Sequence, residues 1–452
     1  MTDTRRKENK MGIMPIPRLL LTMSLPIVLS MMVQALYNIV DSMFVAKLNE
    51  DALTAVSLAF PIQNLMIAVA SGTGVGINSL LSRNLGEKNY DGANRAASNG
   101  LFLGIISSVV FSVFGGILAG TFFRIQPSDA QIVGYGTQYM QLITIFSIGI
   151  FLQVTCERLL QATGKTFYAM ITQGTGAIVN IILDPIMIFG LFGFPRLEVA
   201  GAALATITGQ MIAALMALVF NITRNKEIQI HIKGFRPNGS VIATIYAVGV
   251  PSIIMMSIGS IMTFGMNKIL LMFSSTAAAV FGVYFKLQSF IFMPIFGLNN
   301  GMIPIIAFNY GARHKKRIMH TMWLSIGTAI VIMFFGLAIF QLYPDVMLGI
   351  FDASSHMLKI GIPALRIISL SFIFAGFCIV VGSVFQALGN GVYSMIVSVA
   401  RQLFVILPVA FIFAKVFGLH MVWWAIPIAE LVSVVLSAFF LRRIYVQKIK
   451  SL

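Results

Sequence analysis

Long runs of apolar residues without a charge recur along the whole chain. No Asp, Glu, Lys or Arg occurs between Arg95 and Arg124, or between Arg317 and Asp345. A helix needs roughly 20 apolar residues to cross the hydrocarbon core of a membrane. The pattern therefore predicts twelve transmembrane helices, near residues 17–42, 52–82, 97–122, 132–157, 165–190, 198–222, 239–267, 276–308, 318–343, 358–384, 390–414 and 420–441.

These runs are continuous, whereas the strands of a membrane β-barrel alternate apolar and polar residues. The sequence thus predicts an all-α integral membrane protein. The uncharged stretch Ile367–Ala400 is long enough for most of two helices, and Gly389-Asn390-Gly391 supplies the turn between them.

The composition excludes a soluble protein. Hydrophobic residues make up 58% of the chain, charged residues make up 10%, and the mean hydropathy is +0.90. Soluble domains have about 45–50% apolar and about 25% charged residues. Paired His and carboxylate residues, a Ser/Lys dyad and a metal-binding motif are absent from the sequence. We therefore expect neither an enzyme nor a bound cofactor.

A net charge of +16 could indicate nucleic-acid binding, but the basic residues fall in short clusters between the apolar runs. Cytoplasmic loops of membrane proteins are rich in Lys and Arg. If the spans alternate across the membrane, most of the 31 Lys and Arg residues lie on the same side as the N-terminus. We expect both termini in the cytoplasm, the lipid bilayer as the surroundings, and no nucleic-acid partner.

Internal similarity appears at an offset of 225 residues, about half of the chain. Pro26 corresponds to Pro251, and Gln161-Ala162-x-Gly164 corresponds to Gln386-Ala387-x-Gly389. Six residues of the second span, Phe60, Gln63, Gly72, Gly76, Asn84 and Gly86, recur as Phe285, Gln288, Gly297, Gly301, Asn309 and Gly311. Copies with six helices each insert the same way up, as in transporters with two lobes. The expected domains are an N-terminal lobe (1–223), a cytoplasmic connector (224–237) and a C-terminal lobe (238–452).

Ionisable groups at membrane depth are costly and usually functional. Three acids are predicted to lie well inside spans: Asp41, Asp184 and Glu430. On the first helix, Asp41 shares one face with Gln34, Tyr37 and Asn38, because these residues are three, four and seven positions apart. That face is expected to point into the protein or into a wet cavity.

On the fifth predicted helix, Asn180 and Asp184 share a face, and Pro185 leaves the carbonyl of Ile181 without its helical donor. Together with Asp41, these groups can form an oxygen cage for Na⁺, the only metal ion we expect. The two carboxylates can instead share a proton, because like charges at close range disfavour double ionisation. The alternative is a pair of unrelated aspartates that are hydrogen-bonded to backbone near helix ends.

The charged residues predicted inside spans of the second half include Lys286, Arg401 and Glu430. Arg401 and Glu430 are on neighbouring helices, and we expect them to pair, since buried charges need partners. A structural ion pair is favoured there over substrate binding. Some of the 27 Met and 37 Phe residues should line an adaptable cavity. Polar candidates for that cavity are Gln34, Asn38, Gln63, Lys286, Gln288, Arg401 and Glu430.

Several motifs make the chain resemble the multidrug and toxic compound extrusion (MATE) family over almost its whole length. They are Pro26-Ile27, Tyr37-Asn38-x-x-Asp41, Gly72 to Gly76 with Arg83-x-x-Gly86, Gln161-Ala162-x-Gly164, Asn180-x-x-x-Asp184-Pro185 and Gly201-Ala202-Ala203-x-Ala205-Thr206. The resemblance implies a cation site in the N-terminal lobe, formed by Asp41, Asn180, Asp184 and Thr206 with Tyr37 nearby. Acids that some members carry in the seventh and tenth helices are absent here. Coupling should therefore depend on the first lobe.

The resemblance implies secondary active export of amphipathic, often cationic small molecules in exchange for H⁺ or Na⁺. We expect a monomer in a bacterial or archaeal cell membrane. The alternative is a flippase for a lipid-linked intermediate, which would need many basic groups for a pyrophosphate. The spans offer Lys286, Arg366 and Arg401 for that purpose, so the flippase ranks second.

Overall fold

The computed structural model describes residues 8–126, 129–230 and 234–452. Four basic residues that support the predicted orientation, Arg5, Arg6, Lys7 and Lys233, lie outside these ranges. The described residues form helices, with α1 (Lys10–Ile13), α2 (Ile16–Ala46), α3 (Glu50–Gly86), α4 (Tyr90–Ile125), α5 (Ala130–Ile145), α6 (Ile148–Ala162), α7 (Thr166–Phe189), η1 (Leu191–Gly193) and α8 (Val199–Thr223) in the first half.

The second half contains the corresponding long helices and several short ones. They are α9 (Gly239–Leu271), α10 (Ser275–Gly311), α11 (Lys315–Leu342), α12 (Pro344–Gly349), α13 (Ser355–Ser369), α14 (Phe372–Ala387), α15 (Gly391–Val399), η2 (Ala400–Ile406), α16 (Leu407–Val416), α17 (Leu419–Val422), α18 (Ala425–Ile444) and η3 (Tyr445–Ile449). The turn at Gly389-Asn390-Gly391 lies between α14 and α15, as predicted, and Gly389 adopts φ +75°. Positive φ is easily tolerated by glycine.

Two of the predicted spans are each broken into a pair of helices. Ten helices among the described residues are long and apolar enough to cross a membrane, and the pairs α5–α6 and α13–α14 bring the number to 12. These pairs bend by 44° and 49°. The bends flank Ser147 and Ser371, whose hydroxyls donate to the carbonyls of Ser108 (3.1 Å) and Ile368 (2.6 Å). The predicted spans 132–157 and 358–384 are therefore not straight helices.

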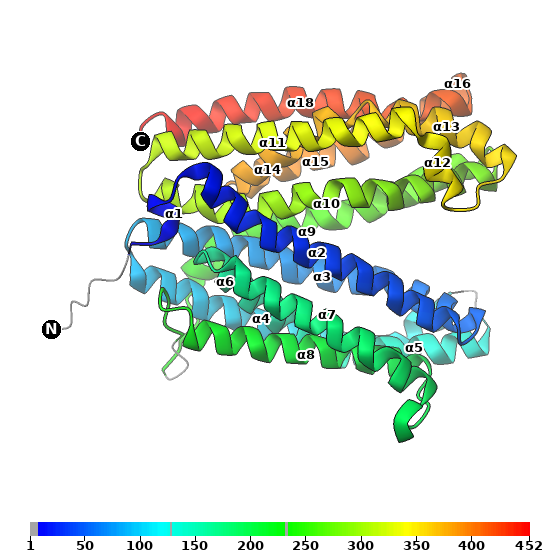
Figure 1. Ribbon diagram of the computed structural model, residues 1–452, viewed down its shortest axis with the longest axis horizontal. Helices are drawn as coiled ribbons and strands as arrows, with labels where there is room; N and C mark the ends of the chain where they lie inside the picture. The colour runs from blue at the N-terminus through cyan, green and yellow to red at the C-terminus, as the bar shows by residue number, and fades with distance from the viewer. Residues whose placement is uncertain (1–7, 127–128, 231–233) are drawn as a thin grey trace.

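The helices gather into two bundles, α2–α8 and α9–α18, which meet along α2, α3, α9 and α10 (Figure 1). Helix α1, near the first described residue, and the C-terminus lie at one end of the molecule, which we call the termini end (Figure 1). The bundles are close together at the termini end and diverge toward the opposite end (Figure 1).

Glycines bring the bundles into backbone contact at the termini end. A Cβ atom at Gly86 of α3 would overlap the carbonyl of Phe308 on α10, and one at Gly311 of α10 would overlap the carbonyl of Arg83 on α3. The repeated glycines of α3 and α10, Gly72, Gly76, Gly86, Gly297, Gly301 and Gly311, all lie at this junction. Because a side chain would separate the helices, these positions require glycine.

Polar contacts close the same end of the junction. Ser79 Oγ donates to the carbonyl of Gln386 (2.9 Å), and Arg158 Nη1 donates to Asn300 Oδ1 (2.8 Å). The arginine comes from α6 in the first bundle and the asparagine from α10 in the second. The predicted span 132–157 ended just before Arg158, and this boundary was wrong: Arg158 lies inside α6, four residues before its end.

The short helix α1 also bridges the two bundles. Asn9 Nδ2, at its N-cap, donates to the carbonyl of Thr163 in the first bundle (3.1 Å). The carbonyl of Met11 accepts from Asn309 Nδ2 (3.0 Å) and from Arg317 Nη2 (2.9 Å) in the second. The Met11 side chain is fully buried. The junction at the termini end is therefore held by packing and hydrogen bonds together.

Candidate functional site

A buried polar site lies inside the first bundle, between α2, α7 and α8. Asn180 and Asp184 of α7 are 2% and 0% exposed. Asn180 Nδ2 donates to Thr206 Oγ1 on α8 (3.2 Å) and approaches Asp184 Oδ1 (3.4 Å). The backbones of α7 and α8 approach closely about one helical turn from Asn180, because Gly176 and Gly209 face each other. That approach places Thr206 opposite Asn180.

Asp41 of α2 completes the site from the other side. The carboxyl groups of Asp41 and Asp184 lie within hydrogen-bonding reach of each other. Two ionised carboxylates at this separation repel strongly in a low-dielectric interior, so they need a proton or a cation between them. The alternative of two unrelated aspartates does not fit this arrangement.

Three oxygen atoms of the site lack a hydrogen-bond donor among the described residues. They are Asp41 Oδ1, Asn180 Oδ1 and Asp184 Oδ2, and all three are buried. Buried polar atoms in native proteins are almost always satisfied. With Thr206 Oγ1, they offer an all-oxygen set of the kind that binds hard cations such as Na⁺. The donor set thus fits a small cation, and the carboxyl pair fits a proton.

Aromatic and amide side chains surround the carboxyl pair. Tyr37 lies close enough to the charges of Asp41 and Asp184 to interact with both, and it also interacts with Gln34. Gln34 Oε1 in turn accepts from Gln173 Nε2 of α7 (2.6 Å). The sequence placed Gln34, Tyr37 and Asp41 on one inward face, and each of them is partly buried there.

Tyr139 of α5 belongs to the same site and was missed from the sequence. It is 2% exposed, and its Oη accepts from Gln63 Nε2 of α3 (2.9 Å). Tyr139 also interacts electrostatically with Asp41 and Asp184. A tyrosine in an apolar span has no spacing signal, because its partners come from α2, α3 and α7. Asn38, on the same face of α2, is exposed and can therefore contact water or a ligand.

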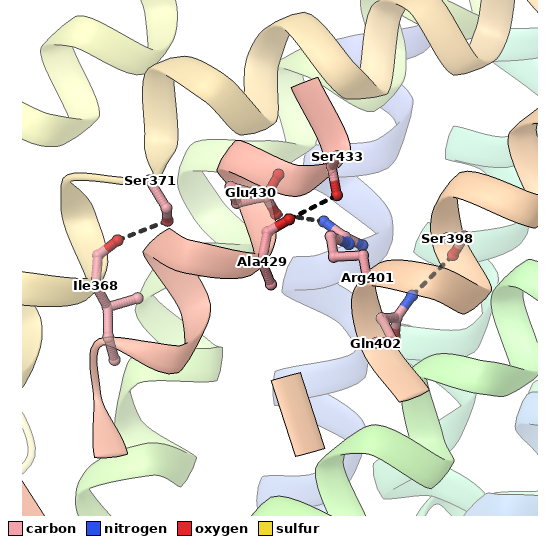
Figure 2. Close-up of polar contacts among 8 residues, drawn as sticks. All are labelled: Ile368, Ser371, Ser398, Arg401, Gln402, Ala429, Glu430 and Ser433. Atoms are coloured by element: carbon pink, nitrogen blue, oxygen red, sulfur yellow. Dashed lines mark hydrogen bonds and ion pairs between the residues drawn. The ribbon is translucent and has the colours of Figure 1, made fainter. Parts of the chain in front are cut away.

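The second bundle holds a charged pair of a different kind (Figure 2). Arg401 Nη1 donates to Glu430 Oε1 at 2.6 Å, and the side chains are 26% and 5% exposed. This confirms that the two residues pair. Arg401 lies in the π-helix η2, whereas Glu430 lies on α18. Glu430 Oε2 is buried without a hydrogen-bond donor among the described residues.

Neighbouring polar side chains of this pair are engaged locally. Ser433 Oγ donates to the carbonyl of Ala429 on α18 (2.9 Å), and Gln402 Nε2 donates to Ser398 Oγ (2.9 Å), as Figure 2 shows. These bonds leave Arg401 as the group that neutralises Glu430. The pair therefore resembles a closed ion pair more than a site that awaits a cation.

Lys286 and Gln288 lie on α10, apart from any ion pair found among the described residues. Lys286 is exposed, and its Nζ lies 5.8 Å from the centre of the Phe351 ring. Gln288 is partly buried. A lysine above an aromatic ring remains free to meet a ligand, since such contacts are weak at exposed positions.

Another buried acid, Glu157 of α6, was also missed, because the predicted span ended there. Glu157 is 7% exposed. Its Oε1 accepts from Gln153 Nε2 (3.0 Å) and from Thr172 Oγ1 of α7 (3.2 Å). A longer span, ending at Ala162, would have revealed this residue as an intramembrane acid.

The chain is similar to known transporters over nearly its whole length. A family model described as MatE matches residues 26–186 and again residues 251–412. A multidrug export protein MepA of Staphylococcus haemolyticus is 27% identical over 417 residues, with 92% of this chain and 91% of that protein covered. The MepA of Staphylococcus aureus strain MSSA476 is also 27% identical, over 423 residues.

Solved structures share the fold. The outward-facing conformation of a multidrug resistance MATE family transporter of the MOP superfamily matches with a TM-score of 0.92 and 25% identity, covering 99% of both chains. A MOP superfamily transporter from Pyrococcus furiosus, described as having a binding pocket of reverse polarity, matches with a TM-score of 0.90 and 25% identity. It covers 97% of this chain and 98% of that one.

Proposed function

Because the chain belongs to the MatE family of multi-pass membrane transporters and is not an enzyme, we propose that it exports amphipathic, often cationic organic compounds in exchange for H⁺ or Na⁺. The observation that carries the proposal is the site of Asp41, Asn180, Asp184 and Thr206. The paired carboxyl groups of this site, and its three buried oxygen atoms that accept no hydrogen bond among the described residues, suit a coupling ion. The MepA relatives are named as multidrug exporters, which supports the substrate class.

Ion binding acts by changing the charge between α2 and α7. Neutralising one carboxylate changes the local charge by one unit. At about 4 Å and an effective dielectric near 20, such an interaction is worth about 4 kcal/mol. That energy biases a two-state equilibrium by roughly a thousandfold. Pro26 interrupts the hydrogen bonding of α2, so this helix can bend when the charge changes.

The two lobes, 1–223 and 238–452 with the connector 224–237, move against each other. The twofold match of one family model supports this division. With both termini in the cytoplasm of a bacterial or archaeal cell, the closed termini end is the cytoplasmic gate. The structure then corresponds to an outward-open state of a monomer. Tyr37 adjusts the environment of the carboxyl pair.

The polar residues outside the ion site serve the substrate. Lys286 and Gln288 line the cavity from the second lobe, and Gln34, Asn38 and Gln63 line it from the first. Arg401 and Glu430 act mainly as a structural ion pair. Because Arg401 is already neutralised by Glu430, the basic groups left for a pyrophosphate are too few to favour a lipid flippase.

The test is dye export from vesicles. The purified protein is reconstituted into proteoliposomes that contain ethidium, and a pH gradient and a Na⁺ gradient are imposed separately. Export driven by either gradient, and none without a gradient, supports the proposal. Equal rates with and without gradients, or movement of a fluorescent lipid-linked pyrophosphate instead of ethidium, would overturn it.

A further inference from the structure

Glu157 is a buried acid that the ion site of Asp41 and Asp184 does not use. It lies five residues before the end of α6 and is 7% exposed. The ion pairs found among the described residues do not include it. An isolated carboxylate inside a membrane protein is costly, and such groups usually have a function.

The groups around Glu157 are nearly all neutral. Gln153 and Thr172 donate to its Oε1. On α8, Asn221 binds the carbonyl of Cys156. Among the described residues, Arg158 is the titratable group that acts on Glu157, and Glu157 in turn acts on Cys156; both lie on α6 itself, and none comes from α3, α4, α7, α8 or α10.

Arg158 does not neutralise Glu157 through a direct contact. Its guanidinium turns the other way, to Gln161 Oε1 (3.0 Å) and Asn300 Oδ1 (2.8 Å). Consecutive residues of α6 thus face different structures: Glu157 faces α7 inside the first lobe, and Arg158 faces the second lobe. A change at Glu157 lies next to a contact that holds the termini end closed.

The position of Glu157 is displaced along the lobe from the first ion site. Its partner Thr172 precedes Asp184 by twelve residues on α7, a distance of about 18 Å along a helix. Polar side chains of α2 and α7 lie between them: Gln34 interacts with Tyr37 of the first site and accepts a hydrogen bond from Gln173, the neighbour of Thr172. Polar groups therefore extend from the first site toward the termini end.

We propose that Glu157 is a second proton-binding site of the first lobe, on the side of the termini end. It takes up and releases the proton near the gate that Arg158 and Asn300 close. The inference rests on the proposed function for its role in transport. A proton, rather than Na⁺, is the ligand, because Gln153 and Thr172 donate to the Glu157 carboxyl and so turn hydrogen atoms, which a cation cannot use as ligands, toward it. No group of three His, Cys, Asp or Glu residues suited to a metal occurs in the described part of the chain.

The first arm of the test detects the proton itself. Infrared difference spectra between acidic and alkaline pH are recorded for the wild-type protein in detergent, and for E157Q, E157D and the control E87Q. Glu87 is a partly exposed acid paired with Arg83. We expect a protonated-carboxyl band that is lost in E157Q and kept in E157D and E87Q. If folded E157Q shows the same protonated-carboxyl bands as the wild type, the proposal is overturned, whatever the protein transports.

The second arm measures ethidium export from proteoliposomes. In E157Q, export driven by a pH gradient should fall on the order of tenfold, the size of a typical coupling between two sites. E157D should restore part of it, and E87Q should match the wild type. Export driven by a Na⁺ gradient should change little. An equal loss with both gradients would mark Glu157 as structural and would overturn the proposal. If the wild-type protein exports no ethidium, the proposed function fails, and the infrared arm still decides whether Glu157 binds a proton.

Discussion

The two lobes share one helical plan but place their charges differently. In the first lobe, Asp41 and Asp184 face each other, and no cation pairs with either of them among the described residues. In the second lobe, Glu430 is held by Arg401 at 2.6 Å. At the offset of 225 residues, Asp41 corresponds to Met266 and Asp184 to Val409. The second lobe thus carries apolar side chains where the first carries its carboxyl pair.

The first lobe, in turn, has small residues where the second lobe has its ion pair. Glu430 corresponds to Ala205 of the first lobe and Arg401 to Gly176. Gly176 packs closely on α8, where an added Cβ would lie 3.0 Å from the Gly209 carbonyl oxygen. The small residues let α7 and α8 approach and bring Thr206 to Asn180. The Arg401–Glu430 pair occupies the equivalent place in the second lobe. The carboxyl site that we propose for the coupling ion and the Arg401–Glu430 ion pair thus lie on equivalent helices of the two lobes.

The largest effect is expected from neutralising a carboxyl of the first lobe. Asp184→Asn should reduce gradient-driven ethidium export by roughly a thousandfold, because the charge change that biases the two states is worth about 4 kcal/mol. Its melting temperature should stay near that of the wild type, since the substitution keeps the shape of the side chain. The exposed Asp345→Asn serves as the control. If Asp184→Asn retained export, the first lobe would not differ from the second in carrying the carboxyl group that couples transport to the ion.

In the second lobe, charge removal should affect stability instead. Arg401→Gln leaves Glu430 buried without its partner, which should cost about 3–5 kcal/mol. The double variant Arg401→Gln with Glu430→Gln should recover most of that loss, because no charge remains buried. Thermal unfolding in detergent measures both. If the single variant is as stable as the wild type, the pair is not structural.

Adding one methyl group tests whether close packing of α3 on α10 keeps the termini end closed. Gly86→Ala should separate α3 from α10, because the new Cβ overlaps the Phe308 carbonyl. Overpacking costs about 1–3 kcal/mol, which lowers the population of the closed state relative to the open one by about fivefold to about a hundredfold. Maleimide labelling of a Ser79→Cys variant should accelerate accordingly. Gly327→Ala, where a Cβ meets open space, should leave the labelling rate unchanged. Faster labelling in both variants would contradict the claim that the close helix contact at Gly86 holds the termini end closed.

The smallest effect concerns Lys286. Lys286→Met removes a cation from a weak contact with Phe351. Since exposed cation–π contacts are worth about 0.5–1 kcal/mol, we expect a change of about two- to fivefold in the relative export of cationic and neutral dyes. The melting temperature should not change. A lower melting temperature with an unchanged dye profile would assign Lys286 a structural role.

Much of this arrangement could be predicted from the sequence, because apolar runs set the helices and the 225-residue offset reveals the repeat. The inward placement of Asp41 and Asp184 followed from helical spacing, and the pairing of Arg401 with Glu430 followed from the cost of buried charge. Tyr139 was missed, since its partners come from other helices, and Glu157 was missed because the predicted span ended at that residue. The bends at Ser147 and Ser371 were missed because hydrophobicity does not report helix direction.

The central claim is that ion coupling depends on the first lobe. It is tested most directly by Asp41→Asn in ethidium-loaded proteoliposomes, with pH and Na⁺ gradients imposed separately and rates normalised to inserted protein. We predict loss of export with either gradient, with correct folding and insertion. Full gradient-driven export by Asp41→Asn would contradict the claim and would place the coupling site elsewhere, with Glu430 as the next acid to test.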